Sequence, residues 1–157
     1  MTAANRNRGA VTERMVVAWL RAHGWPDAER AIVTGHRTRT RTRPDHGDVT
    51  GIPGVCVQVK SLRPVNAAER AVPAWMAETE AQRHASGADI GVLVVRRDGT
   101  AFVGEWFCWV PLSTVVMLTS GLSSAELGEV PLRLSVADAA RILWRAGYCP
   151  ETGGTSQ

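Results

Sequence analysis

One short segment, residues 90–95 (IGVLVV), constrains the fold more than any other part of the chain, because it contains no polar side chain. A continuous apolar run that is rich in β-branched residues is typical of a strand covered on both of its faces. We therefore expect these residues to form a buried strand at the centre of a sheet, with helices packed on either side.

The other elements are predicted from the spacing of apolar residues and from the residues that begin or end helices. Gly24 can end the first helix, Pro73 suits the first turn of the second, and Ser135 is a favourable N-cap for the third. The three helices with apolar residues at helical spacing are predicted at 11–23, 73–86 and 136–146. Further strands are predicted at 28–34, 47–52, 55–61 and 101–110, and residues 112–119 are ambiguous between helix and strand. This order predicts an α/β domain with a central mixed β-sheet flanked by helices.

Length and composition indicate one globular domain. The chain has 157 residues, of which 45% are hydrophobic and 21% are charged. We assign residues 1–149 to a single domain and residues 150–157 to a flexible C-terminal tail. No apolar run approaches the roughly 20 residues that span a bilayer, and the polar N-terminus lacks the apolar core of a secretory signal. We therefore expect a cytoplasmic protein without membrane association.

Basic side chains are concentrated in the first third of the chain. Residues 1–43 contain nine arginines against three acidic residues, and the net charge of the whole chain is +3. If the segment RTRTRTR is extended, its four arginines lie on one face and can follow the phosphates of a nucleic acid. The alternative is a solvated loop, but the absence of interleaved acids favours DNA contact. The four arginines are Arg37, Arg39, Arg41 and Arg43.

The candidate chemistry lies in residues 45–61 (DHGDVTGIPGVCVQVKS). Gln58 and Lys60 are two positions apart and share one face of an extended strand, while Asp48 lies on the strand before them. Oxygen ligands from an acid and an amide suit Mg²⁺, and a lysine can position water or neutralise charge on a phosphate. Lys60 is also the only lysine among 18 basic residues. The segment therefore predicts metal-dependent phosphodiester chemistry, with a turn-proximal surface acid as the alternative for Asp48.

This prediction depends on the connection between the two strands. A regular two-residue turn at Pro53-Gly54 would place Asp48 and Gln58 on opposite faces of the sheet. Pro followed by Gly suits a type II turn rather than the primed turns of two-residue hairpins. We therefore expect a three-residue connection or a bulge, which would pair Asp48 directly with Gln58.

The segment GDVTGIPGVCVQVK resembles the PD-(D/E)XK nuclease superfamily, in which an acidic residue is followed, after a short connection, by acid-any-lysine. Here Asp48 matches the first acid, and Gln58-Val59-Lys60 matches the second element with glutamine in place of the acid. Archaeal-type and phage Holliday junction resolvases are similar over roughly residues 8–110, including a first helix with a glutamate, here Glu13. The resemblance implies a restriction-endonuclease-like fold and a homodimer that cleaves branched DNA in recombination and repair, in the host cytoplasm if the protein is phage-encoded.

The resemblance also implies individual roles. Asp48, the amide oxygen of Gln58 and the backbone carbonyl of Val59 would hold Mg²⁺, for which Mn²⁺ substitutes. Lys60 would assist the attacking water, and Glu13 would approach from the first helix. Thus Lys60, Asp48, Gln58 and Glu13 are the candidate catalytic residues. Gln82, on the second predicted helix, joins the arginine run as a candidate DNA contact.

Two other functions remain open from the sequence. Gln58 brings no negative charge, although some restriction enzymes of the Mrr-like group resemble this QxK form. The chain could be a restriction-like or repair nuclease that cuts duplex DNA. It could also be a DNA-binding pseudonuclease whose active site has decayed at Gln58.

Overall fold

The structure is a computed structural model, and it describes residues 3–31, 47–61, 65–121 and 130–150. Its helices are α1 (Ala3–Ala22), α2 (Val65–Ser86), α3 (Leu112–Ser120), α4 (Val136–Arg145) and the short 3₁₀ helix η1 (Val103–Glu105). Its strands are β1 (Glu29–Arg30), β2 (Val49–Thr50), β3 (Val55–Lys60), β4 (Ile90–Val95), β5 (Phe107–Pro111) and β6 (Pro131–Ser135). None of the described helices is long and apolar enough to cross a membrane.

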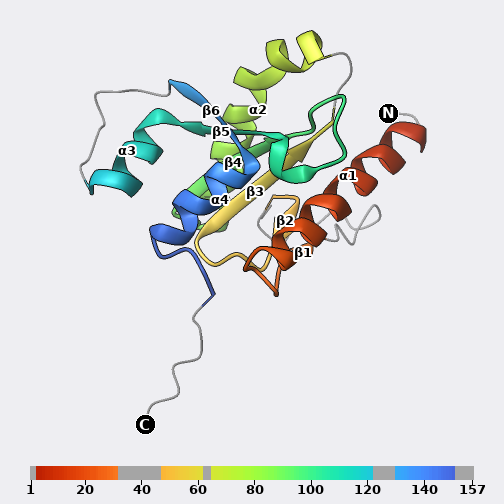
Figure 1. Cartoon of the computed structure of the whole chain (residues 1–157). Helices are drawn as coiled ribbons and strands as arrows, with labels where there is room; N and C mark the ends of the chain where they lie inside the picture. Colours follow the sequence, from red (N-terminus) through yellow and green to blue (C-terminus); the bar gives the residue numbers. More distant parts are fainter. Residues whose placement is uncertain (1–2, 32–46, 62–64, 122–129, 151–157) are drawn as a thin grey trace.

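The six strands form one mixed sheet in the order β1-β2-β3-β4-β5-β6. Only the β3–β4 pair is parallel, and α2 is the crossover connection between these two strands. The other neighbouring pairs are antiparallel. Figure 1 shows α1 and α4 on one face of the sheet and α2 on the other. The expected α/β architecture with a mixed sheet flanked by helices is therefore confirmed.

Alternation along the strands divides the buried side chains between the two faces. Val57 and Val59 of β3 belong to a large core that includes residues of α1 and α4. Leu93 and Val95 of β4 belong to a smaller core that they share with α2. Every residue of β4 is buried, as predicted from its continuous apolar sequence.

Several predicted boundaries are wrong, each for a physical reason. The second helix begins at Val65 rather than at Pro73, which lies inside it. Ala68 and Val72 pack against the sheet and keep this earlier part helical, although a proline removes one backbone hydrogen bond. The strand predicted at 101–110 begins only at Phe107, because η1 precedes it and the buried Trp106 donates its indole N–H to the Thr100 carbonyl at 3.1 Å.

At the two ends of the sheet the predictions were incomplete. The first helix begins at Ala3, eight residues before its predicted start. Strand β6 was not predicted at all, because it has only five residues, begins with a proline and contains exposed and partly buried positions but no buried one. Residues 112–119, ambiguous in sequence, form helix α3. The Ser135 cap is confirmed, since its hydroxyl accepts a hydrogen bond from the Asp138 N–H. Part of the predicted strand 28–34 and most of the predicted tail lie outside the described residues.

A close backbone approach holds the β2–β3 hairpin against the segment before β1. Gly51 has a φ of +81°, and a Cβ added there would lie 1.8 Å from the carbonyl oxygen of Asp27. Gly99 has a similar φ of +85°, but a Cβ added there would meet nothing within 4 Å. Replacing either glycine by alanine therefore strains the backbone at a positive φ, but only at Gly51 would the added Cβ also collide with other atoms.

We expect Gly51→Ala to destabilise the fold more than Gly99→Ala does. Both variants incur about 1–2 kcal/mol for an alanine in the left-handed region, and only Gly51→Ala must also displace backbone. The additional loss should be about 2 kcal/mol or more. Urea unfolding of both variants and the wild type measures it, and equal destabilisation would contradict the close approach at Gly51.

Candidate functional site

The turn between β2 and β3 sets the register on which the candidate site depends. The Val55 N–H donates to the Ile52 carbonyl at 3.1 Å, and Gly54 has a φ of +74°. With Pro53 before it, this is the arrangement of a type II turn. Val49 pairs with Val57, which brings Asp48 beside Gln58. The pairing is thus offset by one residue from that of a regular two-residue hairpin at Pro53-Gly54, and the predicted register, with Asp48 opposite Gln58, is confirmed.

Asp48 lies immediately before β2, and its side-chain carboxylate, rather than a backbone carbonyl, accepts the next hydrogen bond from β3. The Asp48 N–H donates to the Val57 carbonyl at 2.8 Å, and the Val59 N–H donates to Asp48 Oδ2 at 2.8 Å. In an extended strand the N–H and C=O of one residue point to the same side. The carbonyl of Val59 therefore points toward the side on which the Asp48 carboxylate lies.

On the face of β3 that α2 covers, Gln58 and Lys60 meet the same carboxylate. Glu78 Oε2 lies 2.7 Å from Lys60 Nζ and 3.2 Å from Gln58 Nε2. This contact confirms that Gln58 and Lys60 share one face of the strand. Lys60 Nζ also lies 6.0 Å from the ring centroid of Trp75, one turn earlier on α2.

Gln58 is held from both ends of its amide. It is only 3% exposed, and its Oε1 accepts a hydrogen bond from the Thr79 hydroxyl at 2.6 Å. The carboxylate of Glu78 can only accept, so the NH₂ end of the amide must face it and the oxygen must face Thr79. Thr79 has one hydroxyl hydrogen, and donating it to Gln58 leaves none for the Trp75 carbonyl 2.8 Å away. The amide is therefore fixed in one orientation.

The electrostatics of this cluster favour the ionised form of Glu78. The hydrogen bond from Lys60 lowers the pKa of the Glu78 carboxyl below its ordinary value, partial burial opposes the shift, and the charge of Lys60 and the hydrogen bond from Gln58 add to it. A negative charge is thus present beside Gln58, although Gln58 itself carries none.

The oxygen groups of the site fit a hard cation that keeps most of its water. No group of three or more His, Cys, Asp or Glu side chains with the geometry of a metal site occurs in the described part of the chain. Mg²⁺ is usually bound through one or two carboxylates while it retains several waters. Asp48, with the Val59 carbonyl on the same side of the strand, meets that requirement, while the Glu78 carboxylate contacts Gln58 and Lys60.

The remaining predicted site residues differ in how the structure places them. Glu13 lies on α1, and its carboxylate forms an ion pair with Arg30 of β1. Gln82 lies on α2, one turn beyond Glu78. The predicted DNA-binding arginines Arg37, Arg39, Arg41 and Arg43 lie outside the described residues.

Glu78 and Thr79 were missed as site residues by the sequence analysis. Both lie within the predicted helix 73–86, but helical spacing alone does not say which face meets β3. One signal could have suggested Glu78. The strand with Gln58-Val59-Lys60 has glutamine where the nuclease motif has an acid, and the helix that follows it carries acidic residues that could replace the missing charge. Only the packing of α2 on β3 and β4 decides that position 78 lies above Gln58 and Lys60.

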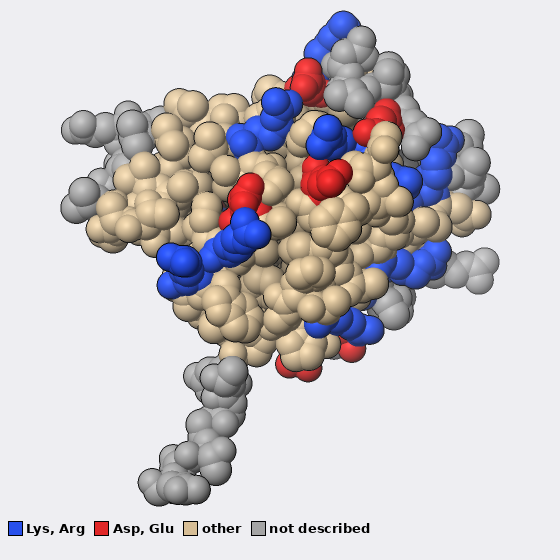
Figure 2. All heavy atoms as spheres, in the orientation of Figure 1, with Lys and Arg blue, Asp and Glu red and all other residues tan. Residues whose placement is uncertain are grey.

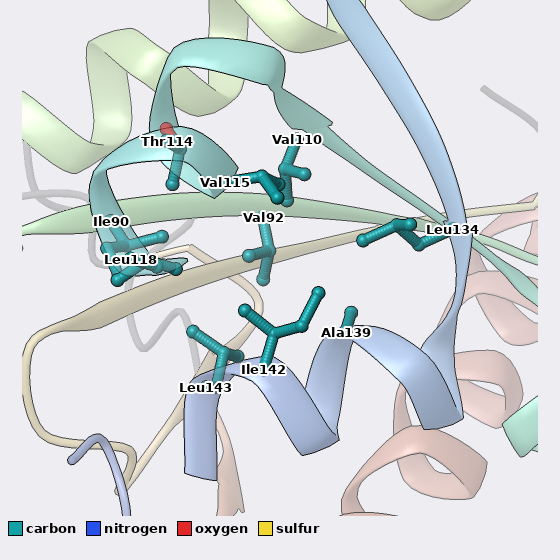
Figure 3. A pocket seen from close by; sticks show the side chains of 10 residues that line it. All are labelled: Ile90, Val92, Val110, Thr114, Val115, Leu118, Leu134, Ala139, Ile142 and Leu143. Carbon is teal, nitrogen blue, oxygen red and sulfur yellow. The ribbon is translucent and has the colours of Figure 1, made fainter. Parts of the chain in front are cut away.

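The other face of the sheet has a different character. Figure 2 shows basic and acidic side chains separated by broad uncharged areas, so the described residues give this face no field of a single sign. A pocket there is lined by apolar groups, and Figure 3 shows α3 and α4 facing one another across Val92, with the Thr114 hydroxyl turned away from the cavity. This pocket contains no group suited to acid–base or metal chemistry.

Comparisons with models of known protein families, with curated proteins and with solved structures find no match to this chain. The functional argument therefore rests on the residues and geometry of the site.

We expect Lys60→Met to raise the pKa of Glu78, because Lys60 is the first cause of its lowering. Glu80 is a matched control on the same helix, since its pKa is lowered mainly by Arg83 and should not change. Carboxyl ¹³C NMR titration of the wild type and of Lys60→Met measures the pKa of Glu78 and of Glu80 in each protein. Because folding lowers the pKa of Glu78, its stabilising contribution is present above the ordinary carboxyl pKa and is lost as pH falls through the lowered value. An unchanged Glu78 titration would contradict the Lys60–Glu78 contact.

Proposed function

We propose that this protein is a Mg²⁺-dependent endonuclease that cleaves branched DNA, with four-way Holliday junctions as its preferred substrate. The observation that carries the proposal is the clustering around β3. The Asp48 carboxylate accepts a hydrogen bond from the Val59 N–H. The side chains of Gln58 and Lys60, which flank Val59 in the strand, both donate to the Glu78 carboxylate. Phosphodiester hydrolysis needs oxygen ligands for a hard metal and a cation near the phosphate, and this arrangement supplies both.

Each residue has a distinct role in the proposal. Asp48 and the Val59 carbonyl would hold the ion, with Gln58 as a further oxygen ligand through its amide. When bound, Mg²⁺ supplies positive charge at the phosphate and a more acidic water. Lys60, with its side chain 26% exposed, can reach a phosphate or an attacking water beyond the strand.

Glu78 takes a positioning role. Its contact with Lys60 holds the amine near the ligands, and its negative charge compensates for the neutral amide at position 58. A junction with two-fold symmetry requires two incisions, so the proposal includes a homodimer with two active sites.

A DNA-binding protein without catalysis is the second candidate, and one observation favours it. The amide oxygen of Gln58 already accepts a hydrogen bond from Thr79 and is aimed into the buried layer between β3 and α2. If that oxygen does not reach the ion, Asp48 remains the only charged ligand on β2 and β3.

Cleavage of a labelled four-way junction with and without Mg²⁺ tests the proposal. We expect metal-dependent cutting by the wild type and a loss of about 100-fold or more in the cleavage rate constant of Lys60→Ala, as for removal of a group that assists proton transfer or charge neutralisation. Arg141→Ala is the control, because Arg141 is exposed on α4 and pairs with Asp138. It should cleave as the wild type does.

The same assay separates the alternatives. Equal cutting of a linear duplex and the junction would favour a restriction-like or repair nuclease. Salt-sensitive binding without cutting of any DNA would favour the non-catalytic protein. Unchanged cleavage by Lys60→Ala would contradict the site itself.

Gln58→Glu tests Gln58 as a ligand. The new carboxylate would stand within hydrogen-bond distance of Glu78, so like-charge repulsion should lower stability in EDTA, and Mg²⁺ should restore it. We expect isothermal titration calorimetry to show several-fold tighter Mg²⁺ binding than in the wild type, because an added ligand charge strengthens hard-metal sites. Unchanged Mg²⁺ affinity would count against Gln58 as a ligand.

A further inference from the structure

The face of the sheet that carries Gln58 and Lys60 continues past α2 onto β5 and β6. Helix α2 packs on β3 and β4, and Phe107 and Trp109 of β5 are only partly buried at the edge of its core. The pairing register places side chains of this face in two rows. One row runs through Lys60, Val95, Phe107 and Ser135, and the other runs through Gln58, Leu93, Trp109 and Arg133.

Cationic side chains lie over the two aromatic rings of this surface. The Arg133 guanidinium lies 4.8 Å from the ring centroid of Phe107 and 5.7 Å from that of Trp109. The Arg97 guanidinium lies 5.7 Å from the Phe107 centroid. We call Arg97, Phe107, Trp109 and Arg133 the arginine–aromatic surface.

The arginines of this surface keep donors available for a ligand. The side chain of Arg133 is 46% exposed, and one of its nitrogens contacts Glu69 at 3.1 Å, which leaves other N–H groups of the guanidinium to donate. Arg97 is exposed, and no carboxylate partner for it occurs among the described residues. A guanidinium held over a ring loses little freedom when it binds a phosphate, since its position is already restricted.

We infer that the arginine–aromatic surface binds a single-stranded segment of DNA that leads into the site around Lys60. The inference rests on the proposed nuclease function for the identity of the nucleic acid. Cations on this face complement phosphates, and the partly buried rings together with the guanidinium planes above them provide flat surfaces on which unpaired bases stack. Bases in a duplex are stacked on one another and offer only their edges, so paired DNA could use the charges but not the rings.

The spacing of the strands fits such a path. Gln58 on β3 and Arg133 on β6 lie in the same row, and three strand spacings, about 14 Å in total, separate them. Unpaired nucleotides at a branch point could therefore contact β5 and β6 while a phosphate further along the same strand, beyond α2, lies at Lys60. This assigns to the nuclease a preference for branched substrates that contain unpaired nucleotides, such as flaps or opened junctions.

Fluorescence anisotropy in EDTA, which prevents cleavage, tests the inference with a short labelled oligo-dT and a duplex of equal length. We expect the wild type to bind the oligo-dT. In Arg97→Gln/Arg133→Gln the affinity should fall roughly tenfold or more, and the dependence of log K on log salt should become shallower by about 1.4, as for two lost phosphate contacts to a single strand. Arg141→Gln, which removes an exposed arginine from α4, should bind as the wild type does.

A stacking variant provides an independent measurement. Trp109→Leu keeps an apolar side chain on β5 but removes the indole, and it should weaken oligo-dT binding roughly five- to hundredfold. Thermal unfolding of each variant checks the fold, and Arg97→Gln alone changes only an exposed side chain. A loss of oligo-dT affinity in Arg97→Gln must therefore come from the arginine–aromatic surface and not from unfolding. Oligo-dT affinity equal to that of the wild type in the double variant and in Trp109→Leu would overturn the inference, as would equal loss of duplex and oligo-dT binding.

The inference and the proposed function can fail separately. Lys60→Ala should lose junction cleavage while it keeps oligo-dT affinity. A wild type that cuts no DNA, with binding that depends on Arg97 and Arg133, would support the surface and refute the nuclease. A wild type that cuts junctions, with a double variant that binds and cuts equally well, would refute the surface and leave the nuclease standing.

Discussion

Burial of Val49 opposite Val57 fixes the register on which the candidate site depends. Val49 is fully buried and Val57 is 3% exposed, both in the core beneath α1. A shift of one residue would turn these valines out of the core, so apolar burial enforces the pairing. That pairing brings Asp48 beside Gln58 and lets the Asp48 carboxylate accept the Val59 N–H. A packing constraint on one face of the hairpin thus positions polar chemistry on the other.

The glutamine at position 58 has a physical explanation in the packing of α2. A carboxylate at this 3% exposed position would stand within hydrogen-bond distance of the Glu78 carboxylate, and Lys60 would be the one cation that the two negative charges share in this contact. The neutral amide instead donates to Glu78 and accepts from Thr79, so each of its ends has a partner. The negative charge lies on α2, where it also holds Lys60. The charges of the site are therefore divided between a strand end and a helix, which makes the site depend on how α2 packs on the sheet.

Much of the fold could be predicted from local sequence, and the errors have common causes. The apolar run of β4, the Pro53-Gly54 turn and the Ser135 cap act through neighbouring residues, and all three predictions are confirmed. The start of α2 and strand β6 depend on tertiary packing that overrides local signals such as a proline. Asp48, Gln58 and Lys60 lie close in sequence, so spacing could relate them. Glu78 could not be assigned, because its role requires the rotation of α2 over β3.

The most direct test of the central claim is an anomalous difference map from a crystal of the protein soaked in Mn²⁺. The proposed site predicts a peak beside the Asp48 carboxylate and the Val59 carbonyl, and its absence from an Asp48→Asn crystal treated in the same way. A Mn²⁺ peak bound only elsewhere, or a peak at β3 that persists without the Asp48 carboxylate, would contradict the account.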